Sequence, residues 1–534
     1  MRSKPRCRLR ARRDDARMTE ADVIIVGAGS AGCVLAARLS QDPRLRITLI
    51  EAGAEPDDPR IAVPAAWPEL QNSAVDWAFR TTPQPELAGR VHPCPRGRVV
   101  GGSSAIHAMG HVRGHPDDFD AWHAAGATGW TWDALVPYFR MSENSPFADA
   151  TLYGGDGPLT LCQPATPHPL TRCHIAAGVE VGLTPIRDHN GPVMAGPTLN
   201  TMTIKDGRRL SVSDAYLHSA VRARRNLRIE TGITVDRLMI GPDGRATGFT
   251  GRRGGHPVAM SASRAVILSA GSIGSPAILM RSGFGPAADL ARLGIPVRRD
   301  MPGIGENLQD HLLSAGNVYR ALQPVPPTTT QHSESLTYIQ AIAADPRAAP
   351  ELVVGVISAP ILSDGLEGLA EAADIGEGYT LMFGITHPRS RGRLRLTSAD
   401  PEVQPQIDPA YLTTEIDRDH FQQALDWARR IGGARAYDGW RLAEVFPRPQ
   451  DLADAEARRN FIACAAVTHH HPIGTCRMGT DPLAVVRPDL TVQGVHGLYV
   501  VDGSTLPSLT TGPVNAAIVA VAERAAEMLK VALR

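Results

Sequence analysis

Three features are missing from this sequence of 534 residues, and each absence excludes a class of protein. The 55 Lys and Arg residues balance the 55 Asp and Glu residues, so no net positive charge favours binding of nucleic acid. No run of about 18 uncharged apolar residues occurs, so we predict no integral membrane segment. The seven cysteines are scattered without a C-x-x-C pair, which argues against a disulfide framework or a structural zinc site. These observations predict a cytoplasmic protein with reduced thiols.

The charge is unevenly distributed, because residues 1–17 carry eight Lys or Arg against two Asp. The pair Arg12-Arg13 is similar to a twin-arginine signal, but charged residues follow where an apolar segment should begin. We therefore interpret residues 1–17 as a disordered basic tail, or as an artefact of the assigned start with Met18 as the natural first residue.

The strongest local pattern is a glycine-rich turn (GAGSAG, 27–32) between the apolar strand 23–26 and a helix. A second apolar strand, 47–50, ends at Glu51. This βαβ pattern is typical of a dinucleotide site, in which glycines let the backbone approach a pyrophosphate at the helix N-terminus. The Glu51 carboxylate is placed to accept hydrogen bonds from ribose hydroxyls and argues against a 2′-phosphate. The βαβ unit alone does not distinguish an NAD site from an FAD site.

A second glycine loop follows at residues 97–109, and one dinucleotide needs two such loops only if it is long. Together with two later segments, these motifs resemble the glucose-methanol-choline (GMC) family of FAD-dependent oxidoreductases, over residues 22–529. The motifs that carry the resemblance are Glu51-Ala52-Gly53 in the βαβ unit, GRVVGGSSAIHAM at 97–109, GSIGSPAILMRSGFG at 271–285, and the block 471–515.

The resemblance implies an α/β fold with a Rossmann-like FAD-binding domain and an interleaved α+β substrate-binding domain. The expected bounds of the FAD-binding domain are 18–160, 200–310 and 475–534, and those of the substrate-binding domain are 161–199 and 311–474. Apolar patterning predicts strands at 226–240 and 393–397. The segment 324–378 is rich in Pro, Ala and Gly, and we expect loops there near the mouth of the active site.

The resemblance also assigns the residues that bind FAD. Beyond the first glycine turn and Glu51, they come from the second loop, from Val235, and from the later family motifs. The expected set is Gly27, Gly29, Ser30, Ala31, Gly32, Glu51, Ala52, Val99, Gly102, Ser103, His107, Ala108, Met109, Val235, Ala270, Gly271, His470, Asp502, Gly503 and Asn515.

The segment 468–475 (THHHPIGT) matches the active-site histidine motif of the family. Oxidation of an alcohol needs a base for the hydroxyl proton, which a neutral imidazole can provide, and the motif match assigns this role to His471. In an extended segment the period of two puts His469 and His471 on one face, with His470 opposite. A histidine tract can also bind metal, but no cysteine or carboxylate accompanies it at ligand spacing, so we predict none.

Three positions depart from the family pattern. The family usually has a second His or Asn opposite the base, where this sequence has Pro513, so the substrate must be held otherwise, by His469 for example. This combination is similar to the pyridoxine-oxidising branch. Ile106 stands where some members attach FAD through a histidine, which predicts non-covalent FAD. His107 replaces a usual Asn, which implies a different flavin contact through an undetermined nitrogen.

The leading hypothesis is oxidation of a primary alcohol to an aldehyde with O₂ reduced to H₂O₂, and pyridoxine converted to pyridoxal. One alternative keeps this half-reaction but passes electrons to a quinone or another redox carrier, as alcohol and choline dehydrogenases do. An alternative of another class is a non-redox lyase, because hydroxynitrile lyases use this fold with FAD as a structural part. The expected partners are therefore a small alcohol and an electron acceptor.

Overall fold

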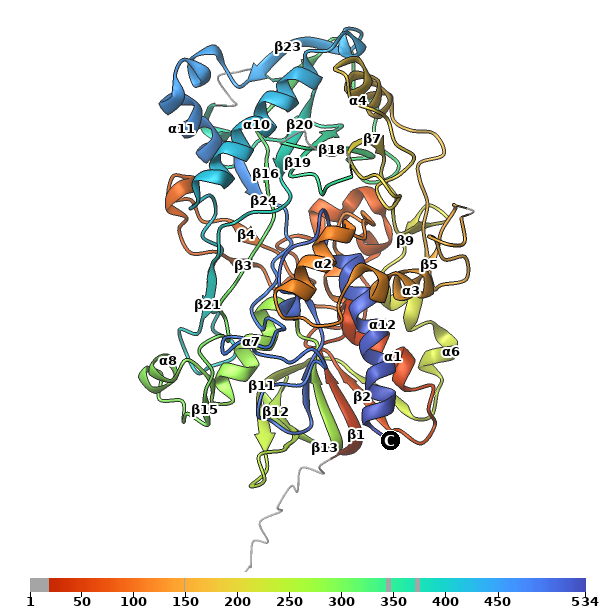
Figure 1. Ribbon diagram of the computed structural model, residues 1–534, viewed down its shortest axis with the longest axis vertical. Helices are drawn as coiled ribbons and strands as arrows, with labels where there is room; N and C mark the ends of the chain where they lie inside the picture. The colour runs from red at the N-terminus through yellow and green to blue at the C-terminus, as the bar shows by residue number, and fades with distance from the viewer. Residues whose placement is uncertain (1–18, 148, 342–346, 370–374) are drawn as a thin grey trace, which may run out of the picture.

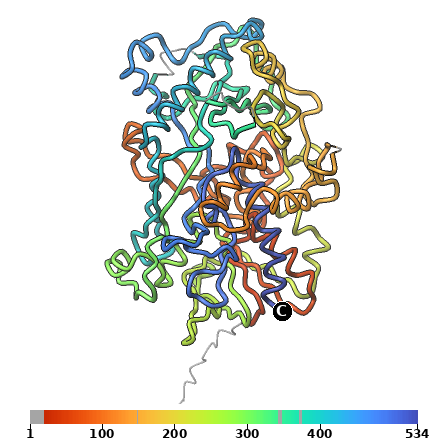
Figure 2. The backbone as a smooth tube through the Cα atoms, viewed as in Figure 1, coloured from red at the N-terminus to blue at the C-terminus, as the bar shows by residue number. Residues whose placement is uncertain are grey.

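The structure is a computed structural model that describes residues 19–147, 149–341, 347–369 and 375–534 (Figure 1). The expectation for residues 1–17 lies outside these ranges. Two large sheets organise the molecule, one in the lower and one in the upper part of Figure 1. The backbone passes between them several times, as the tube in Figure 2 shows. Within the described ranges no helix combines the length and the apolar character needed to cross a bilayer.

The lower sheet has seven strands, in the order β10-β2-β1-β13-β12-β11, with β25 also paired to β13. β10, β2, β1, β13 and β25 are parallel, and β12 and β11 are antiparallel. The strands are β1 (Thr19–Val26), β2 (Ile47–Ile50), β10 (Leu227–Glu230), β11 (Ile233–Ile240), β12 (Ala246–Arg253), β13 (His256–Leu268) and β25 (Leu498–Val500).

The parallel register brings the predicted cofactor motifs to one edge of this sheet. Val26 lies beside both Ile50 and Leu268, and Leu268 lies beside Val500. The turns that follow these four strand ends are therefore neighbours, although they are far apart in the sequence. The carboxyl edge of a parallel sheet is where nucleotide cofactors bind.

The C-terminal segment completes this half of the molecule. β25 extends the lower sheet, and helix α12 (Asn515–Ala532) packs beside helix α1 (Ser30–Leu39). Both helices are rich in Ala and bury most of their residues, so their axes can approach closely. A partly buried ion pair joins them, with Nε of Arg38 2.7 Å from a carboxylate oxygen of Glu523.

The upper sheet has eight strands, all paired antiparallel, in the order β23-β17-β20-β19-β18-β7, with β16 paired to β20 and β24. Helix α10 (Glu415–Gly432) covers one face through Phe421, Leu425 and other apolar residues. The strands are β7 (Gly196–Leu199), β16 (Leu312–Ser314), β17 (Val318–Ala321), β18 (Ser335–Ile339), β19 (Leu352–Ile357), β20 (Gly378–Ile385), β23 (Arg441–Phe446) and β24 (Ala466–Thr468).

The expectation of loops in 324–378 is wrong for two stretches, because β18 and β19 run through this segment, whereas the loop before β18 does line the cavity with Gln331 and Ser333. The apolar run LVVGVI of β19 is buried along its whole length between β18, β20 and α10. Proline and glycine lie mostly between the strands here, so composition averaged over the segment concealed them. The strands predicted at 226–240 and 393–397 are confirmed as β10, β11 and β21 (Arg393–Arg395).

The remaining helices cover the two sheets and the space between them. They include α2 (Pro116–Ala124), α3 (Trp132–Ser142), α4 (Pro169–Glu180), α5 (Val212–Tyr216), α6 (Ser219–Arg222), α7 (Gly271–Arg281), α8 (Ala287–Arg292) and α11 (Ala455–Ala465). Every strand of the upper sheet falls within 161–199 or 311–474, the bounds expected for a substrate-binding domain. The domain bounds themselves stay a prediction.

Candidate active site

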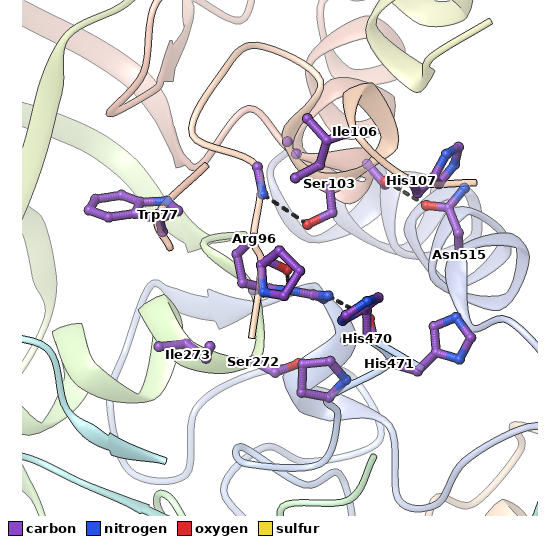
Figure 3. Close-up of a pocket in the computed structure, with 18 of the residues that line it drawn as sticks. Trp77, Arg96, Ser103, Ile106, His107, Ser272, Ile273, His470, His471 and Asn515 are labelled. Atoms are coloured by element: carbon purple, nitrogen blue, oxygen red, sulfur yellow. Dashed lines mark hydrogen bonds between the residues drawn. The ribbon is translucent and has the colours of Figure 1, made fainter. Parts of the chain in front are cut away.

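A cavity of about 590 Å³ runs from the carboxyl edge of the lower sheet to the face of the upper sheet (Figure 3). Glycine turns line one part of it, and His469, His470 and His471 line another. The predicted residues that line it are Gly27, Gly29, Ser30, Ala31, Glu51, Ala52, Gly102, Ser103, His107, Ala108, Met109, Val235, Ala270, Gly271, Asp502, Gly503, Pro513 and Asn515.

Two predicted residues, Gly32 and Val99, do not line this cavity. A Cβ on Gly32 would lie 1.9 Å from the carbonyl oxygen of Gly27, so this glycine allows α1 to pack against its own entry turn. Val99 is fully buried in a small apolar cluster with Leu70 and Ala105. Gly32 and Val99 therefore support the two glycine turns without lining the cavity themselves.

Backbone contacts between two glycine turns form the wall nearest the lower sheet. Gly27 has φ +102°, and a Cβ there would lie 2.4 Å from the carbonyl oxygen of Ser269. Gly102 has φ +54°, and a Cβ there would lie 2.6 Å from Cα of Gly29. The two loops thus touch through main chain, which leaves backbone N–H groups free of side-chain cover.

Glu51 is a buried carboxylate in the wall of the cavity. One oxygen accepts from the N–H of Ala28 at 3.0 Å and the other from the N–H of Gly53 at 2.8 Å. Burial raises the pKa of Glu51 to about 7, although these hydrogen bonds act in the opposite direction. Each oxygen keeps a further lone pair, so the carboxylate can still accept from hydroxyl groups of a ligand.

Two helix N-termini border the same cavity. The N-cap residues of α1 and α12, Gly29 and Val514, make no side-chain capping bond. Ser30 and Asn515 join these two ends, with the hydroxyl donating to Oδ1 of Asn515 at 2.6 Å (Figure 3). Uncapped N–H groups and the positive helix end suit an anionic phosphate or an electron-rich ring.

The hydrogen bonds of His107 fix which of its ring nitrogens carries the proton. Nδ1 lies 3.1 Å from the N–H of Met109 and 3.1 Å from Nη1 of Arg209, and both of these groups can only donate. Burial, followed by the charge of Arg209, lowers the pKa of His107 to about 3, so the ring is neutral. His107 therefore offers Nε2–H as a donor, which sequence reasoning had left undetermined.

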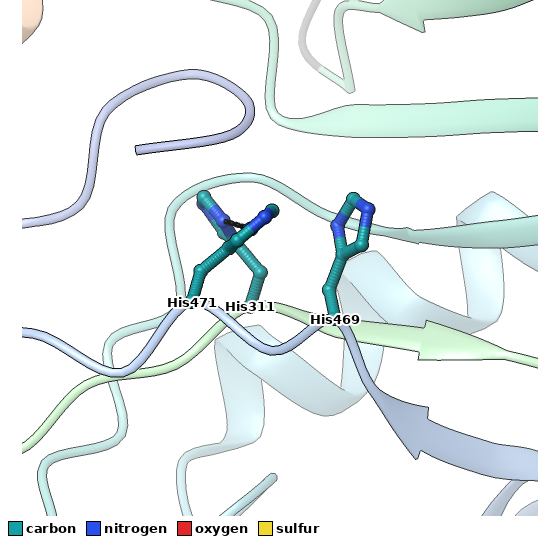
Figure 4. A group of neighbouring side chains, drawn as sticks. All are labelled: His311, His469 and His471. Atoms are coloured by element: carbon teal, nitrogen blue, oxygen red, sulfur yellow. Dashed lines mark hydrogen bonds between the residues drawn. The ribbon is translucent and has the colours of Figure 1, made fainter. Parts of the chain in front are cut away.

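A cluster of three imidazoles lies where the cavity meets the upper sheet (Figure 4). β16 and β24 are antiparallel with Leu312 beside Thr468, so His311 lies next to His469, whose N–H donates to the carbonyl of His311 at 2.9 Å. The rings of His469 and His471 have centroids 4.3 Å apart, as their predicted common face requires. Nδ1 of His311 lies 2.9 Å from Nδ1 of His471.

These imidazoles also lie close enough for a metal ion, with one nitrogen of each within 4.8 Å of the others. The hydrogen bonds argue against a metal ion, because both ring nitrogens of His311 already have partners. One nitrogen faces His471, and the other lies 2.7 Å from the carbonyl oxygen of Thr386. Two nitrogens 2.9 Å apart share a proton between them, in the space that a metal ion would need. That this cluster binds no metal stays a prediction.

Asp310 holds the backbone of the histidine segment. One of its oxygens accepts from the N–H of His471 at 2.6 Å, and the other accepts from Thr468 Oγ1 at 2.6 Å and from the hydroxyl of Tyr411 at 2.5 Å. His470 has φ +66°, and its carbonyl accepts from Arg96 (Figure 3). The turn at His470 separates its ring from those of His469 and His471.

Burial lowers the pKa values of these histidines. The pKa values of His469 and His471 lie well below 6.5, first because of desolvation and then because neighbouring imidazoles oppose a positive charge. The pKa of His311 falls to about 4 and that of His470 to about 3, again mainly through burial. All four rings are therefore neutral at pH 7.

The comparisons with known proteins agree with this geometry. Two family models, both described as GMC oxidoreductase, match residues 21–313 and 388–522. The chain belongs to the GMC oxidoreductase family. This GMC oxidoreductase is 45% identical to pyridoxine 4-oxidase of Microbacterium luteolum, over 95% of this chain and 99% of that relative. It is 37% identical to oxygen-dependent choline dehydrogenase of Photobacterium profundum, over 96% of this chain and 93% of the relative.

A solved structure agrees with these sequence relatives. The crystal structure of pyridoxine 4-oxidase from Mesorbium loti matches with a TM-score of 0.90 and 46% identity, over 96% of this chain and 99% of that chain. The chain is thus an FAD-dependent alcohol oxidoreductase, and the predicted family, fold class and cofactor are confirmed. The glycine walls, the buried Glu51 and the uncapped helix ends all fit FAD.

Sequence reasoning missed two side chains of the site in this GMC oxidoreductase. Arg96 lines the cavity and donates to the carbonyl of His470. His311 contacts His471 directly, and its only local signal was the polar run Gln309-Asp310-His311 before an apolar strand. Both residues act through segments more than 150 positions away, which no local motif could indicate.

Proposed function

We propose that this enzyme oxidises the hydroxymethyl group of pyridoxine to the aldehyde of pyridoxal, with O₂ as the electron acceptor. The proposal is supported by the two pyridoxine 4-oxidases, which match nearly the whole chain at 45% and 46% identity. It is carried by one observation in this structure, the pair of neutral imidazoles of His469 and His471 in the part of the cavity next to the upper sheet, which we call the chamber.

The wall of this chamber favours an uncharged aromatic alcohol over choline. Leu313, Val353 and the adjoining Met382 of the upper sheet form one apolar cluster with Val112 next to the histidines. The described acidic residues that line the cavity are Glu51, Glu402 and Asp502, and none of them belongs to this cluster. A quaternary ammonium group is bound by a carboxylate or an aromatic cage, whereas the members of this cluster that line the cavity are all aliphatic.

Polar atoms of the cavity wall suit a substrate with several polar substituents. Asn200 Oδ1, Thr201 Oγ1 and Trp67 Nε1 line the cavity and are buried without a hydrogen-bond partner among the described residues. Asn200 is held in place, since its amide donates to the carbonyl of Ser333 at 2.8 Å. The ring nitrogen and hydroxyl groups of pyridoxine would satisfy such donors and acceptors, which a simple aliphatic alcohol would leave unpaired.

The chain's own residues supply the proton chemistry. FAD, when bound, supplies the acceptor for the hydride that leaves the alcohol carbon. Nε2 of His471 takes the hydroxyl proton, so an O–H bond breaks and an N–H bond forms while the carbonyl double bond develops. His469, on the same face, holds a polar group of the substrate. Pro513 bounds the chamber near Gly110 and contributes shape without a donor.

Anaerobic mixing of the yellow holoenzyme with pyridoxine tests the proposed reaction. We expect the flavin absorbance to bleach, and we expect pyridoxal and H₂O₂ to form in equal amounts when air is admitted. Bleaching by choline and not by pyridoxine would contradict the substrate. Aldehyde formation that needs an added quinone would contradict O₂ as acceptor, and a flavin that no alcohol reduces would favour the lyase alternative.

We further propose that FAD is held without a covalent bond and that the enzyme is cytoplasmic. Ile106 is a buried side chain at the cavity with no nucleophilic atom. Acid precipitation should therefore release all flavin into the supernatant, and flavin left on the pellet would contradict this. The six described cysteines are free thiols, as expected of a reducing compartment.

A further inference from the structure

The hydrogen bonds around His311 permit a single arrangement of protons. Its Nε2 lies 2.7 Å from the carbonyl oxygen of Thr386, which can only accept, so Nε2 carries a proton. His311 is buried, and its pKa of about 4 leaves one proton on the ring at pH 7. Its Nδ1 is therefore unprotonated and accepts a proton from the atom that faces it.

That atom is Nδ1 of His471, at 2.9 Å, with the two rings at an interplanar angle of 85° (Figure 4). His471 is also neutral, so the proton on Nδ1 leaves Nε2 with a free lone pair. Among the described residues, Nε2 of His471 has no hydrogen-bond partner, and the ring lines the cavity.

The anchor of this arrangement is rigid. Thr386 directly follows β20, which pairs with β19 up to Leu352 beside Ile385. Its N–H donates to the carbonyl of Glu351 at 2.9 Å, and its hydroxyl donates to the carbonyl of Pro350 at 2.6 Å. The carbonyl that holds His311 is therefore fixed by the upper sheet, not by a mobile side chain.

We propose that His311 is a positioning residue, which accepts the Nδ1 proton of His471 and so keeps that ring in the tautomer whose Nε2 can take the substrate proton. This inference rests on the proposed function, in which His471 is the base. When Nε2 gains the hydroxyl proton, Nδ1–H continues to donate to His311, so no second proton moves. The tautomer of an imidazole is set by the hydrogen bond that its other nitrogen makes.

A matched pair of variants tests the role of the Nδ1 acceptor. His311→Leu removes the acceptor, whereas His311→Asn can present Oδ1 near the position of Nδ1, and both lose the bond to Thr386. In rapid-mixing experiments with pyridoxine, we expect His311→Leu to slow flavin reduction by about ten- to a hundred-fold with little change in the dissociation constant of pyridoxine. We expect His311→Asn to recover most of the rate. Equal rates for the two variants would overturn the proposal.

A double variant separates positioning from a general structural effect. If His311 acts through His471, His311→Leu should slow flavin reduction no further in a His471→Ala background. A loss by the same factor in both backgrounds would overturn the proposal, because a purely structural effect would not depend on His471.

Nitrogen-15 NMR of histidine-labelled holoenzyme reads the tautomer without substrate. The signals of His471 are identified by their loss in His471→Ala, and we expect a protonated Nδ1 and an unprotonated Nε2 at pH 7. A resting enzyme with the proton on Nε2 would overturn the proposal, even if His311→Leu does not fold. Because this measurement needs no turnover, a failure of pyridoxine as substrate is distinguished from a failure of the positioning role.

Discussion

The two ends of the cavity are built in different ways. At the lower sheet, contiguous glycine turns present backbone, and the Cα of Gly29 would lie 2.6 Å from a Cβ on Gly102. At the upper sheet, side chains that flank the paired strands β16 and β24 meet, with His311 beside His469 and His471. Cofactor binding therefore depends on backbone N–H groups that no side chain covers. Proton transfer depends on the positions of three imidazole side chains.

Removal of the proposed base gives the largest expected effect. His471→Ala should lower the rate of flavin reduction by pyridoxine by roughly 10²-fold or more, because the proposed proton acceptor is lost. Bound FAD should stay at the wild-type amount. Rapid-mixing absorbance and flavin content measure the two effects. If His471→Ala reduces flavin at the wild-type rate and His469→Ala is inactive, the base is His469 and not His471.

Loss of the buried Glu51 carboxylate should weaken FAD binding at the lower sheet and leave the histidine cluster unchanged. Glu51→Ala should weaken FAD binding by about 1.5–3 kcal/mol, the scale of a hydrogen bond to a charged group. Reconstitution of apoprotein with FAD, followed by fluorescence, measures the dissociation constant. Glu55→Ala is the matched control, since Glu55 pairs with Arg222 at 3.0 Å and does not line the cavity. Equal effects of the two substitutions would show that Glu51 does not contact FAD.

A single methyl group added at Gly102 should disturb the contact between the two glycine turns. Gly102→Ala adds a Cβ 2.6 Å from Cα of Gly29 at a φ of +54°, so we expect a loss of about 1–3 kcal/mol of unfolding free energy and a lower FAD content. Gly155→Ala meets nothing within 4 Å and should change stability by less than about 0.5 kcal/mol. Denaturant unfolding compares the two. Similar values would mean that the contact between the loops is not tight.

The smallest expected effect is on the pH dependence of flavin reduction. A protonated His471 cannot accept a proton, and burial holds its pKa well below 6.5. The rate at saturating pyridoxine should therefore stay nearly constant from pH 7.5 to 6, whereas a base with an ordinary histidine pKa would lose roughly three-quarters of its active form by pH 6. A fall with an apparent pKa near 6.5 would show that the site remains hydrated.

The sequence predicted the two ends unequally, and the reason is physical. The turn from Gly27 to Gly32 was predictable because strand, glycines and helix are contiguous, and local geometry alone makes a phosphate site. The pairing of His469 with His471 was predicted from the period of an extended segment, but β24 ends at Thr468, and a turn with φ +66° at His470 brings the two rings together instead. His311 was not predicted, because it reaches His471 through a strand pairing across 160 positions of sequence. The proton position on His107 likewise needed Arg209, which lies 102 positions away.

The order in which the chain is made gives the lower sheet a further property. β1 and β2 are synthesised long before β25 and α12, which complete and cover the same half of the molecule. Until residues 498–532 leave the ribosome, the β25 edge of β13 and the face of α1 that meets α12 lack their partners. The cavity therefore lacks part of its wall, including Asn515 and Ile518, until α12 has been made. The nascent chain meanwhile exposes apolar surface, and we expect its yield to depend on chaperones and on the supply of flavin.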